Sequence, residues 1–352
     1  MEKSKNRSVN HRDIALAMNI NQSTVSRALD PARCHLVSRE TREKVEAMVS
    51  QLGFRPNIHA RRVRTSCSEA ITLVLDDLTA TEVSYPDFNA HTPRLFMAAV
   101  KGVIDGATEN EFDVKLLPLH SRQPLEQEFM LRRMGFPYSD GVIFLGFHHL
   151  AGIYEPIRKL GIPCVALHGG HSSLPMPKVE TDLASGYRAA VRALAELGHR
   201  DIAFATPCPP EEGSPRRERF EFYRQAMQEL GLEEHIRAVV TPTALELRRA
   251  AEHFAATREF SALLCFNDAV ADLWRREIEY LGLEAGRELS LVGCDGNPAY
   301  HDLATVRIPY YEMGHAAGLH LAQAIKKHQA ETLPGCMLEA VFQPGESTGE
   351  KR

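Results

Sequence analysis

The stretch HRDIALAMNINQSTVSRAL, residues 11–29, decides how the beginning of this chain folds. Apolar residues recur at helical spacing in its first part, which predicts a first helix over residues 11–18. Asn19 follows, and asparagine tolerates the left-handed conformation that a tight turn between helices needs. Asn21 can then cap a second helix over residues 22–29, because its side chain accepts from free backbone N–H groups. Two short helices joined by so tight a turn make a helix-turn-helix.

The second helix has an apolar face and a polar face. Its polar residues, which are free to face outward, are Gln22, Ser23, Ser26 and Arg27. A third helix is predicted over residues 39–52, with Ser38 as its N-cap and Gly53 as its stop signal. The apolar residues of the three helices would then close a small core.

Charge is distributed unevenly along the chain. Residues 1–66 contain 13 Lys and Arg against 6 Asp and Glu, a net charge of +7, and the rest of the chain has a net charge of −12. A small basic unit on an acidic body is typical of a protein that binds a polyanion through that unit. A solvated basic tail is the alternative, but a tail would not explain the helical pattern and the caps.

Composition excludes several classes of protein. With 44% hydrophobic and 25% charged residues the chain resembles ordinary globular proteins. We find no apolar segment of the kind that a secretory signal has, and no run near the roughly 18 residues of a membrane span. The seven cysteines are scattered and never spaced as CxxC, which favours reduced thiols. The sequence therefore predicts a cytoplasmic protein of two or three domains.

Strand-like and helix-like segments alternate through the rest of the chain. The predicted strands are 71–76, 114–119, 141–145, 164–167, 202–206, 238–241, 262–266, 290–294 and 305–308. Helical segments between them include 95–108, 184–197, 219–230, 245–256 and 269–281. Such alternation predicts parallel sheets with helices on both faces, arranged here in two halves.

Several segments resemble the lactose/galactose repressor (LacI/GalR) family in both order and spacing. In the basic unit they are TVSRAL (24–29), VSRETREKVEAMVSQLGFRPN (37–57) and ARRVRT (60–65). In the body, DGVIFLG (140–146) and LSLVGCDG (289–296) are similar to the family's periplasmic-binding-protein-like core. The resemblance implies an α/β protein with an N-terminal helix-turn-helix DNA-binding domain, followed by a core of two parallel-sheet α/β subdomains.

The resemblance also implies domain boundaries. We expect the helix-turn-helix domain at 8–56, a hinge helix and linker at 57–68, and an effector-binding core at 69–345. Because the family's chain crosses between subdomains three times, crossings are expected near residues 178, 303 and 333. The N-subdomain would then hold 69–178 and 304–333, and the C-subdomain 179–303 and 334–345. Residues 346–352 are expected to be a disordered tail, without the leucine heptads of a tetramerisation helix.

The family match assigns DNA contacts to the second helix. Gln22, Ser23 and Arg27 are expected at base edges in the major groove, where Gln can pair with adenine and Arg with guanine. Thr24 and Ser26 are expected at phosphates. Helix capping by Gln22 and Ser23, and a surface ion pair for Arg27, are the alternatives.

Residues 57–64 resemble the family's hinge helix, which forms on specific DNA and enters the minor groove. Val63 stands where the family usually has the leucine that wedges between base steps, and the shorter, β-branched valine is a poorer wedge. The hinge residues expected to contact DNA are Asn57, Ala60, Arg61, Val63 and Arg64. A flexible basic linker is the alternative in the absence of DNA.

Polar residues that follow predicted strands are candidates for ligand binding, because parallel sheets bind ligands at their carboxyl ends. Matched to the family's effector site, the candidates are His168, Arg219, Asn267 and Asp295. Such groups bond sugar hydroxyls, carboxylates or phosphates. We expect Asp268 to cap the next helix instead.

The loop 79–93 departs from the family, and either a stacking surface for a sugar or a decoration at the dimer interface would explain it.

Two other classes of function remain as alternatives. A dehydrogenase would need a glycine-rich turn after the first strand, but residues 76–79 are DDLT. His168 and His171 lack a third ligand nearby, which makes a metal site a weak prediction. A solute-binding protein shares the body fold but has no use for a helix-turn-helix. The sequence thus predicts a regulator without cofactor or metal, most simply a repressor. We expect it to be a homodimer that binds a palindromic operator and a carbohydrate effector.

Overall fold

The computed structural model of this chain divides into two compact units, a head (residues 1–66) and a core (residues 67–352). The structure describes residues 9–30, 33–54, 62, 67–75, 92–118, 128, 131–135, 137–145, 151–167, 174–211, 214–329, 333 and 335–351.

The described residues 9–30 and 33–54 of the head form α1 (His11–Met18), α2 (Gln22–Ala28), a short 3₁₀ turn η1 (Cys34–Leu36) and α3 (Arg39–Leu52). The predicted helices are confirmed to within one residue. So are the predicted caps, because Asn21 accepts from the Ser23 N–H and Ser38 accepts from the Thr41 N–H. Asn19 has the expected left-handed conformation, with φ 50° and ψ 45°.

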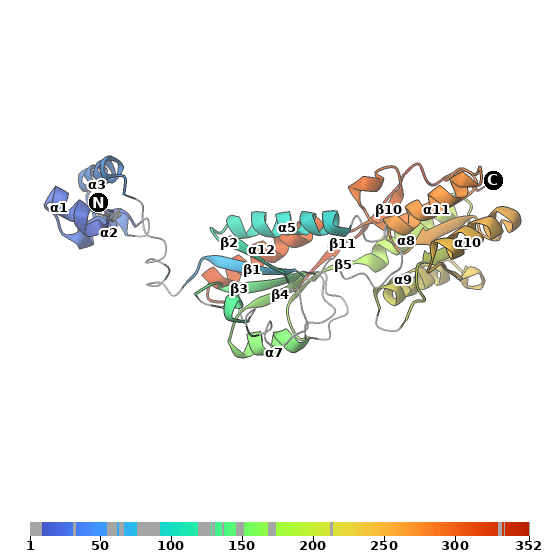
Figure 1. Cartoon of the computed structure of the whole chain (residues 1–352), viewed down its shortest axis with the longest axis horizontal. Coiled ribbons are helices and arrows are strands. Elements are labelled where there is room, and N and C mark those ends of the chain that lie inside the picture. Colours follow the sequence, from blue (N-terminus) through green and yellow to red (C-terminus); the bar gives the residue numbers. More distant parts are fainter. Residues whose placement is uncertain are drawn as a thin grey trace, which may run out of the picture. The chain divides into compact units, whose positions relative to one another are not determined.

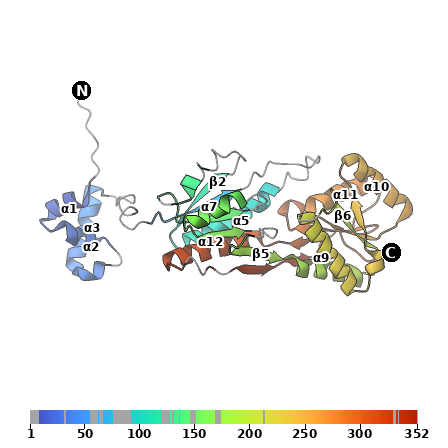
Figure 2. The ribbon, with the colours of Figure 1, turned by 90° about the horizontal axis from the view of Figure 1, so that it is seen from below.

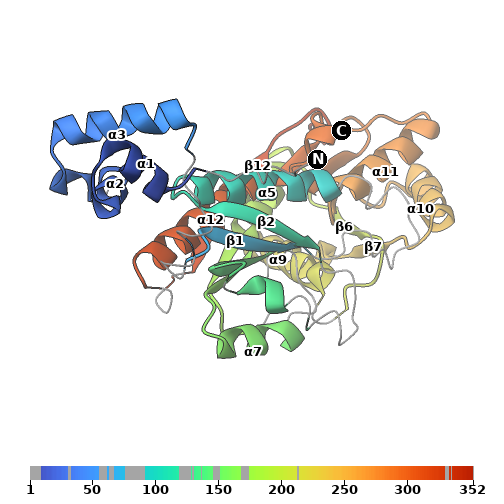
Figure 3. The same cartoon turned by 60° about the vertical axis from the view of Figure 1, so that its left-hand side comes forward.

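The core begins with a six-stranded, all-parallel sheet in the order β11-β5-β4-β3-β1-β2. Its strands are β1 (Ala70–Leu75), β2 (Asp113–Pro118), β3 (Gly141–Leu145), β4 (Cys164–Leu167), β5 (Lys178–Asp182) and β11 (Cys336–Glu339). The helices of this half that the structure describes throughout are α5 (Thr92–Thr108), α7 (Ala151–Lys159) and α12 (Tyr310–Lys326), and residues 131–134 are also helical. Helices α5 and α12 cover one face of the sheet and α7 covers the other (Figure 1, Figure 3).

The second sheet has the order β12-β10-β9-β8-β6-β7, and only β12 is antiparallel to its neighbour. Its strands are β6 (Ile202–Thr206), β7 (Ala238–Val240), β8 (Ala262–Cys265), β9 (Ser290–Asp295), β10 (Ala304–Arg307) and β12 (Val341–Gln343). The helices around it are α8 (Leu183–Glu196), α9 (Pro215–Glu229), α10 (Ala244–Thr257) and α11 (Asp268–Tyr280), with short turns η2 (Glu233–His235) and η3 (Pro298–Tyr300). The predicted two-sheet architecture is confirmed, and the C-terminal end of the chain lies with this second half (Figure 2).

The chain passes between the sheets three times: after β5, after β10, and between β11 and β12. Each crossing lies a few residues beyond the expected positions near 178, 303 and 333. Residues 304–307, expected in the first half, pair with β9 of the second sheet, and residues 336–339, expected in the second half, form β11 of the first. The boundaries at β5 and β11 were wrong because both strands are only partly buried, so no fully buried apolar run marks them in the sequence. Strand β10 was predicted as a strand, but its sheet is decided by its pairing with β9.

The prediction of a disordered tail at 346–352 is wrong for residues 346–351, which are well defined. The Ser347 side chain is only 4% exposed. Its hydroxyl donates to the Leu291 carbonyl at 2.7 Å and accepts from the Ala304 N–H at 2.9 Å. The segment GESTGEK has no apolar residues, yet its polar atoms close the amino end of the second sheet.

Helices α5 and α12 touch through glycine. A Cβ atom placed on Gly102 would lie 2.1 Å from the carbonyl oxygen of Tyr311, and one on Gly314 would lie 2.0 Å from that of Ala99. Gly106 and Gly318, one turn further along each helix, are equally close to the partner helix. The two helices therefore pack backbone against backbone along this contact.

Candidate nucleic-acid interface and effector site

Helix α2 presents a polar face to solvent because its apolar face is used inside the head. Val25 is fully buried with Ile14 and Val45, whereas Gln22 and Arg27 are exposed. An exposed arginine and glutamine on a short helix of a basic unit suit the edges and backbone of a nucleic acid.

The remaining polar residues of α2 differ in exposure. Ser23 is exposed, and its hydroxyl donates to the Asn21 side chain at 3.0 Å, so Ser23 also takes part in capping. Thr24 and Ser26 are half buried at the sides of the helix. The hinge candidates Asn57, Ala60, Arg61, Val63 and Arg64 lie outside the described residues.

The core contains a buried ion pair at the carboxyl edge of its second sheet. Arg219 from α9 and Asp295 from the end of β9 are 6% and 8% exposed, and Arg219 Nη2 lies 2.9 Å from Asp295 Oδ1. Arg219 Nη1 donates to the carbonyl of Phe266, and the guanidinium lies 4.7 Å from the centre of the Phe266 ring. Protein groups therefore contact one face and two nitrogens of the guanidinium and one oxygen of the carboxylate.

Burial and the partner's charge act in opposite directions on the pKa of each group in this pair. Burial alone would lower the pKa of Arg219, but the surrounding acidic groups, among them Asp295, outweigh it and hold that pKa well above its ordinary value. Burial raises the pKa of Asp295, and the positive charge of Arg219 offsets part of that rise. Each charge of the pair favours the charged form of the other, which opposes the cost of burial.

Asn267 is the third candidate. It is buried and directly follows Phe266, whose carbonyl accepts from Arg219. Its side-chain oxygen accepts from the Val270 N–H at 2.9 Å and so caps α11, which leaves the amide NH₂ group as a separate donor. The structure thus brings together three of the four predicted effector residues, and the fourth, His168, lies outside the described residues together with positions 79–91 of the long loop.

The prediction that Asp268 caps α11 is wrong, because Asn267 fills that role. Asp268 instead accepts from the Asn297 N–H and from the Thr305 hydroxyl, both at 2.6 Å. Burial, together with the nearby charge of Asp295, raises the pKa of Asp268 to about 7. A Cβ atom on Gly293 would lie 2.2 Å from an Asp268 oxygen, so glycine in LVGCDG is what lets this carboxylate approach β9.

Sequence reasoning missed Tyr310, the first residue of α12. This nearly buried tyrosine hydrogen-bonds Asp295, and its ring meets Phe96 edge-on with centroids 6.2 Å apart. It connects a helix of the first half to the buried pair of the second. The sequence signal was available in PYYEMG, directly after a predicted strand, but nothing local distinguishes Tyr310 from Tyr311.

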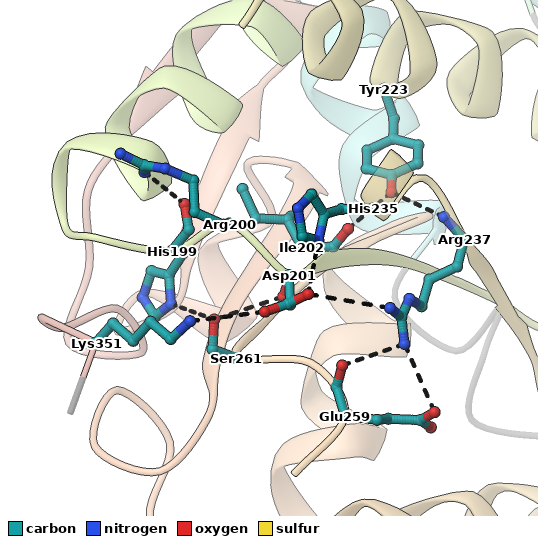
Figure 4. Close-up of polar contacts among 10 residues, drawn as sticks. All are labelled: His199, Arg200, Asp201, Ile202, Tyr223, His235, Arg237, Glu259, Ser261 and Lys351. Atoms are coloured by element: carbon teal, nitrogen blue, oxygen red, sulfur yellow. Dashed lines mark hydrogen bonds and ion pairs between the residues drawn. The ribbon is translucent and has the colours of Figure 1, made fainter. Parts of the chain in front are cut away.

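A second polar cluster lies at the opposite, amino edge of the second sheet (Figure 4). His199 Nε2 donates to the Gly349 carbonyl at 3.0 Å, so the Ser261 hydroxyl donates to Nδ1 at 2.8 Å. Asp201 accepts from His235 at 2.7 Å and pairs with Lys351 at 3.6 Å. These contacts hold the C-terminal segment in place and are structural in character.

Comparison with known proteins agrees with this arrangement. Residues 11–57 match the model of "Bacterial regulatory proteins, lacI family", and residues 191–348 match "Periplasmic binding protein-like domain". The chain is 30% identical over 358 residues to an uncharacterised HTH-type transcriptional regulator of Streptomyces limosus, and the match covers 94% of this chain and 91% of the relative. This chain belongs to the LacI family. As a LacI-family protein it is a DNA-binding transcription regulator and not an enzyme, and the alternative of a solute-binding protein is set aside.

Solved LacI-family structures share the fold. A lac repressor dimer, bound to operator and the anti-inducer ONPF, superposes with a TM-score of 0.71 at 20% identity and covers 97% of this chain and 99% of its own. The regulator CelR in complex with cellobiose gives a TM-score of 0.62 at 22% identity and covers 96% and 99%. The predicted fold class is confirmed. Within the described residues no helix is long and apolar enough to cross a membrane, and no group of His, Cys, Asp and Glu could hold a metal ion.

Proposed function

We propose that this LacI-family regulator is a cytoplasmic homodimer that represses transcription from a palindromic operator, under the control of a carbohydrate effector. In this proposal the helix-turn-helix (8–56) reads each half-site, the hinge (57–68) grips its centre, and the core (69–345) binds the effector. The observation that carries the effector assignment is the buried Arg219–Asp295 pair with Asn267 beside it.

Operator reading is assigned to the exposed face of α2. Gln22, Ser23 and Arg27 would contact bases, with Thr24 and Ser26 at phosphates. The hinge residues Asn57, Ala60, Arg61, Val63 and Arg64 are proposed contacts in the minor groove. Selection of a randomised duplex library on the full-length chain tests this assignment. A palindromic consensus supports it, and recovery of random sequence would refute it.

The charges around the buried pair favour an uncharged effector. Arg219 is already neutralised by Asp295, and Asp268 adds a second buried carboxyl close by. An anionic ligand would therefore meet no uncompensated positive charge at this pair. A sugar hydroxyl can both donate to a carboxylate and accept from a guanidinium or an amide, so a neutral, hydroxyl-rich ligand fits these partners. The relative CelR is solved with cellobiose, and His168 is proposed as a further contact.

A thermal-shift panel of neutral sugars, sugar phosphates and nucleobases, cellobiose included, tests the effector proposal. A true ligand at about 100 times its dissociation constant should add about 2.7 kcal/mol of stability. Asp295→Asn should abolish the shift. Asp302→Asn, whose partner Arg275 keeps a second carboxylate in Asp272, should preserve it. An identical shift in the Asp295→Asn variant, or a response to sugar phosphates alone, would contradict the proposal.

The homodimer proposal rests on exposed apolar side chains in the first half of the core. Met97 and Ile104 on α5, and Leu116 on the edge strand β2, are large apolar residues that face solvent in the single chain. Large apolar side chains that a single chain leaves exposed on a helix and on an edge strand would be covered in an interface between two chains. Sedimentation equilibrium should show a dimer at micromolar concentration, and a tetramer or a monomer would count against it.

A further inference from the structure

The core begins with a strained turn. Cys67 is its first residue and β1 starts at Ala70. Between them Glu69 has φ 50°, in the left-handed region that residues other than glycine and asparagine rarely adopt. Such a conformation persists only where the surrounding structure enforces it, and strain of this kind gathers at functional and switch positions.

One carboxylate, that of Asp140, holds the chain on both sides of Glu69. Asp140 Oδ1 accepts from the Ser68 N–H at 2.8 Å. Its Oδ2 accepts from the Cys67 thiol at 3.2 Å and from the Ala70 N–H at 3.4 Å. Hydrogen bonds to a charged acceptor are about twice as strong as neutral ones, so this carboxylate is a firm anchor.

Two neighbouring strands complete the anchor. The carbonyl of Glu69 accepts from the N–H of Asp113, the first residue of β2, at 2.9 Å. Asp140 itself directly precedes β3, and its neighbour Ser139 donates to the Ala70 carbonyl at 3.3 Å. The turn is therefore fixed to three adjacent strands of the first sheet and not to β1 alone.

We propose that Asp140 and Glu69 are positioning residues that set the direction in which the chain leaves the core toward the DNA-binding head. A rotation about φ of Glu69 would redirect every residue that precedes it. With the turn fixed, a movement of the first sheet is transmitted to the linker. With the turn free, the linker gains conformations that must be given up again when both heads of a dimer sit on one operator. Binding of a single head to unrelated DNA has no such requirement.

The test compares three full-length variants. Asp140→Asn keeps the shape of the side chain but turns one acceptor into a donor. Glu69→Gly removes the strain and the restriction at the turn. The matched control is Glu111→Gly, because Glu111 is also a left-handed glutamate, φ 63°, but lies in the exposed turn before β2. Glycine relieves strain at both sites, and only Glu69→Gly frees the linker.

Affinity is measured by fluorescence anisotropy on two duplexes of equal length: the site that the wild-type chain selects from a randomised library, and a scrambled version of it. Asp140→Asn and Glu69→Gly should weaken binding to the selected duplex about 5- to 30-fold, the effect of leaving one further residue to be ordered. Binding to the scrambled duplex should not change, and Glu111→Gly should match wild type on both.

Three results overturn the inference. If Asp140→Asn and Glu69→Gly both bound the selected duplex as tightly as wild type does, the turn would not position the heads. An equal loss on the scrambled duplex would show a general defect instead of a positioning role. Since the inference rests on operator binding by the dimer, a wild-type chain that prefers neither duplex would overturn it together with the operator proposal.

Discussion

Replacing Asp295 with alanine takes away the carboxylate that faces the buried guanidinium of Arg219. Arginine does not lose its proton in proteins, so a full positive charge would remain on a residue that is only 6% exposed. Breaking a buried pair by removing one partner costs about 3–5 kcal/mol. At roughly 2–4 °C per kcal/mol for large domains, the thermal midpoint of the core should fall by roughly 6–20 °C.

The opposite substitution, Arg219→Met, should cost less. It leaves Asp295 without its guanidinium, but a carboxylate can bind a proton, and burial already raises the pKa of Asp295. The folded state of this variant then binds a proton that the unfolded state releases above about pH 4. Its stability relative to wild type should therefore fall as pH rises from 5 to 7. Asp295→Ala should show no such slope from this site.

Calorimetry of the core transition at pH 5 and pH 7 measures both effects. Glu277→Ala is the control, because its partner Arg248 lies 3.1 Å away but is half exposed, and surface pairs contribute at most about 1 kcal/mol. The double variant Arg219→Met/Asp295→Leu should recover most of the loss, since it leaves no buried charge behind. If Asp295→Ala melted within 2 °C of wild type, or if the double variant were no better than Asp295→Ala, the electrostatic reasoning would be refuted.

Three further predictions concern the head, the helix pair and the C-terminal segment. Arg27→Ala should lose about 1–3 kcal/mol on the selected operator and relax its sequence preference in anisotropy titrations, whereas an equal loss on scrambled DNA would make Arg27 a phosphate contact only. Gly314→Ala should lower the unfolding free energy by about 1–3 kcal/mol in urea titrations, because its Cβ would lie 2.0 Å from the Ala99 carbonyl; an unchanged midpoint would show that the helices can separate freely. Ser347→Ala should cost about 1–3 kcal/mol by the same assay, since it removes the buried hydroxyl that contacts Leu291, and a neutral result would indicate that the segment adds nothing to stability.

Local patterns predicted the three helices 11–18, 22–29 and 39–52 of the head. Apolar spacing gave its helices, and the caps Asn21, Ser38 and Gly53 gave their ends, because each signal acts within a few residues of itself. The same holds for the nine apolar strands of the core, each found within one residue of its predicted start. The strands β5, β11 and β12 escaped prediction because charged residues interrupt the apolar pattern of β5, and because β11 and β12 pair with strands distant along the chain.

The candidate effector site was likewise predictable in its local features but not in its long-range contacts. Its residues could be proposed one at a time from their places after strands, but the pairing of Arg219 with Asp295 joins positions 76 residues apart. Tyr310 was missed for a related reason, because the start of α12 meets the end of β9 only in the folded chain. Asp268 was misjudged because either of two adjacent polar residues, Asn267 or Asp268, can cap a helix, and sequence does not tell which one turns inward.

The glycine contact between α5 and α12 has a mechanical consequence. Where two helices meet through side chains, they can slide by exchanging rotamers, but Gly102, Gly106, Gly314 and Gly318 leave no rotamers to exchange. We therefore expect the two helices to move together. Tyr310 is the first residue of α12, so a displacement of its hydroxyl should move α5 along with α12. We therefore expect substitutions that alter the proposed effector response to lie in the loops, because the backbone contact between α5 and α12 cannot adjust.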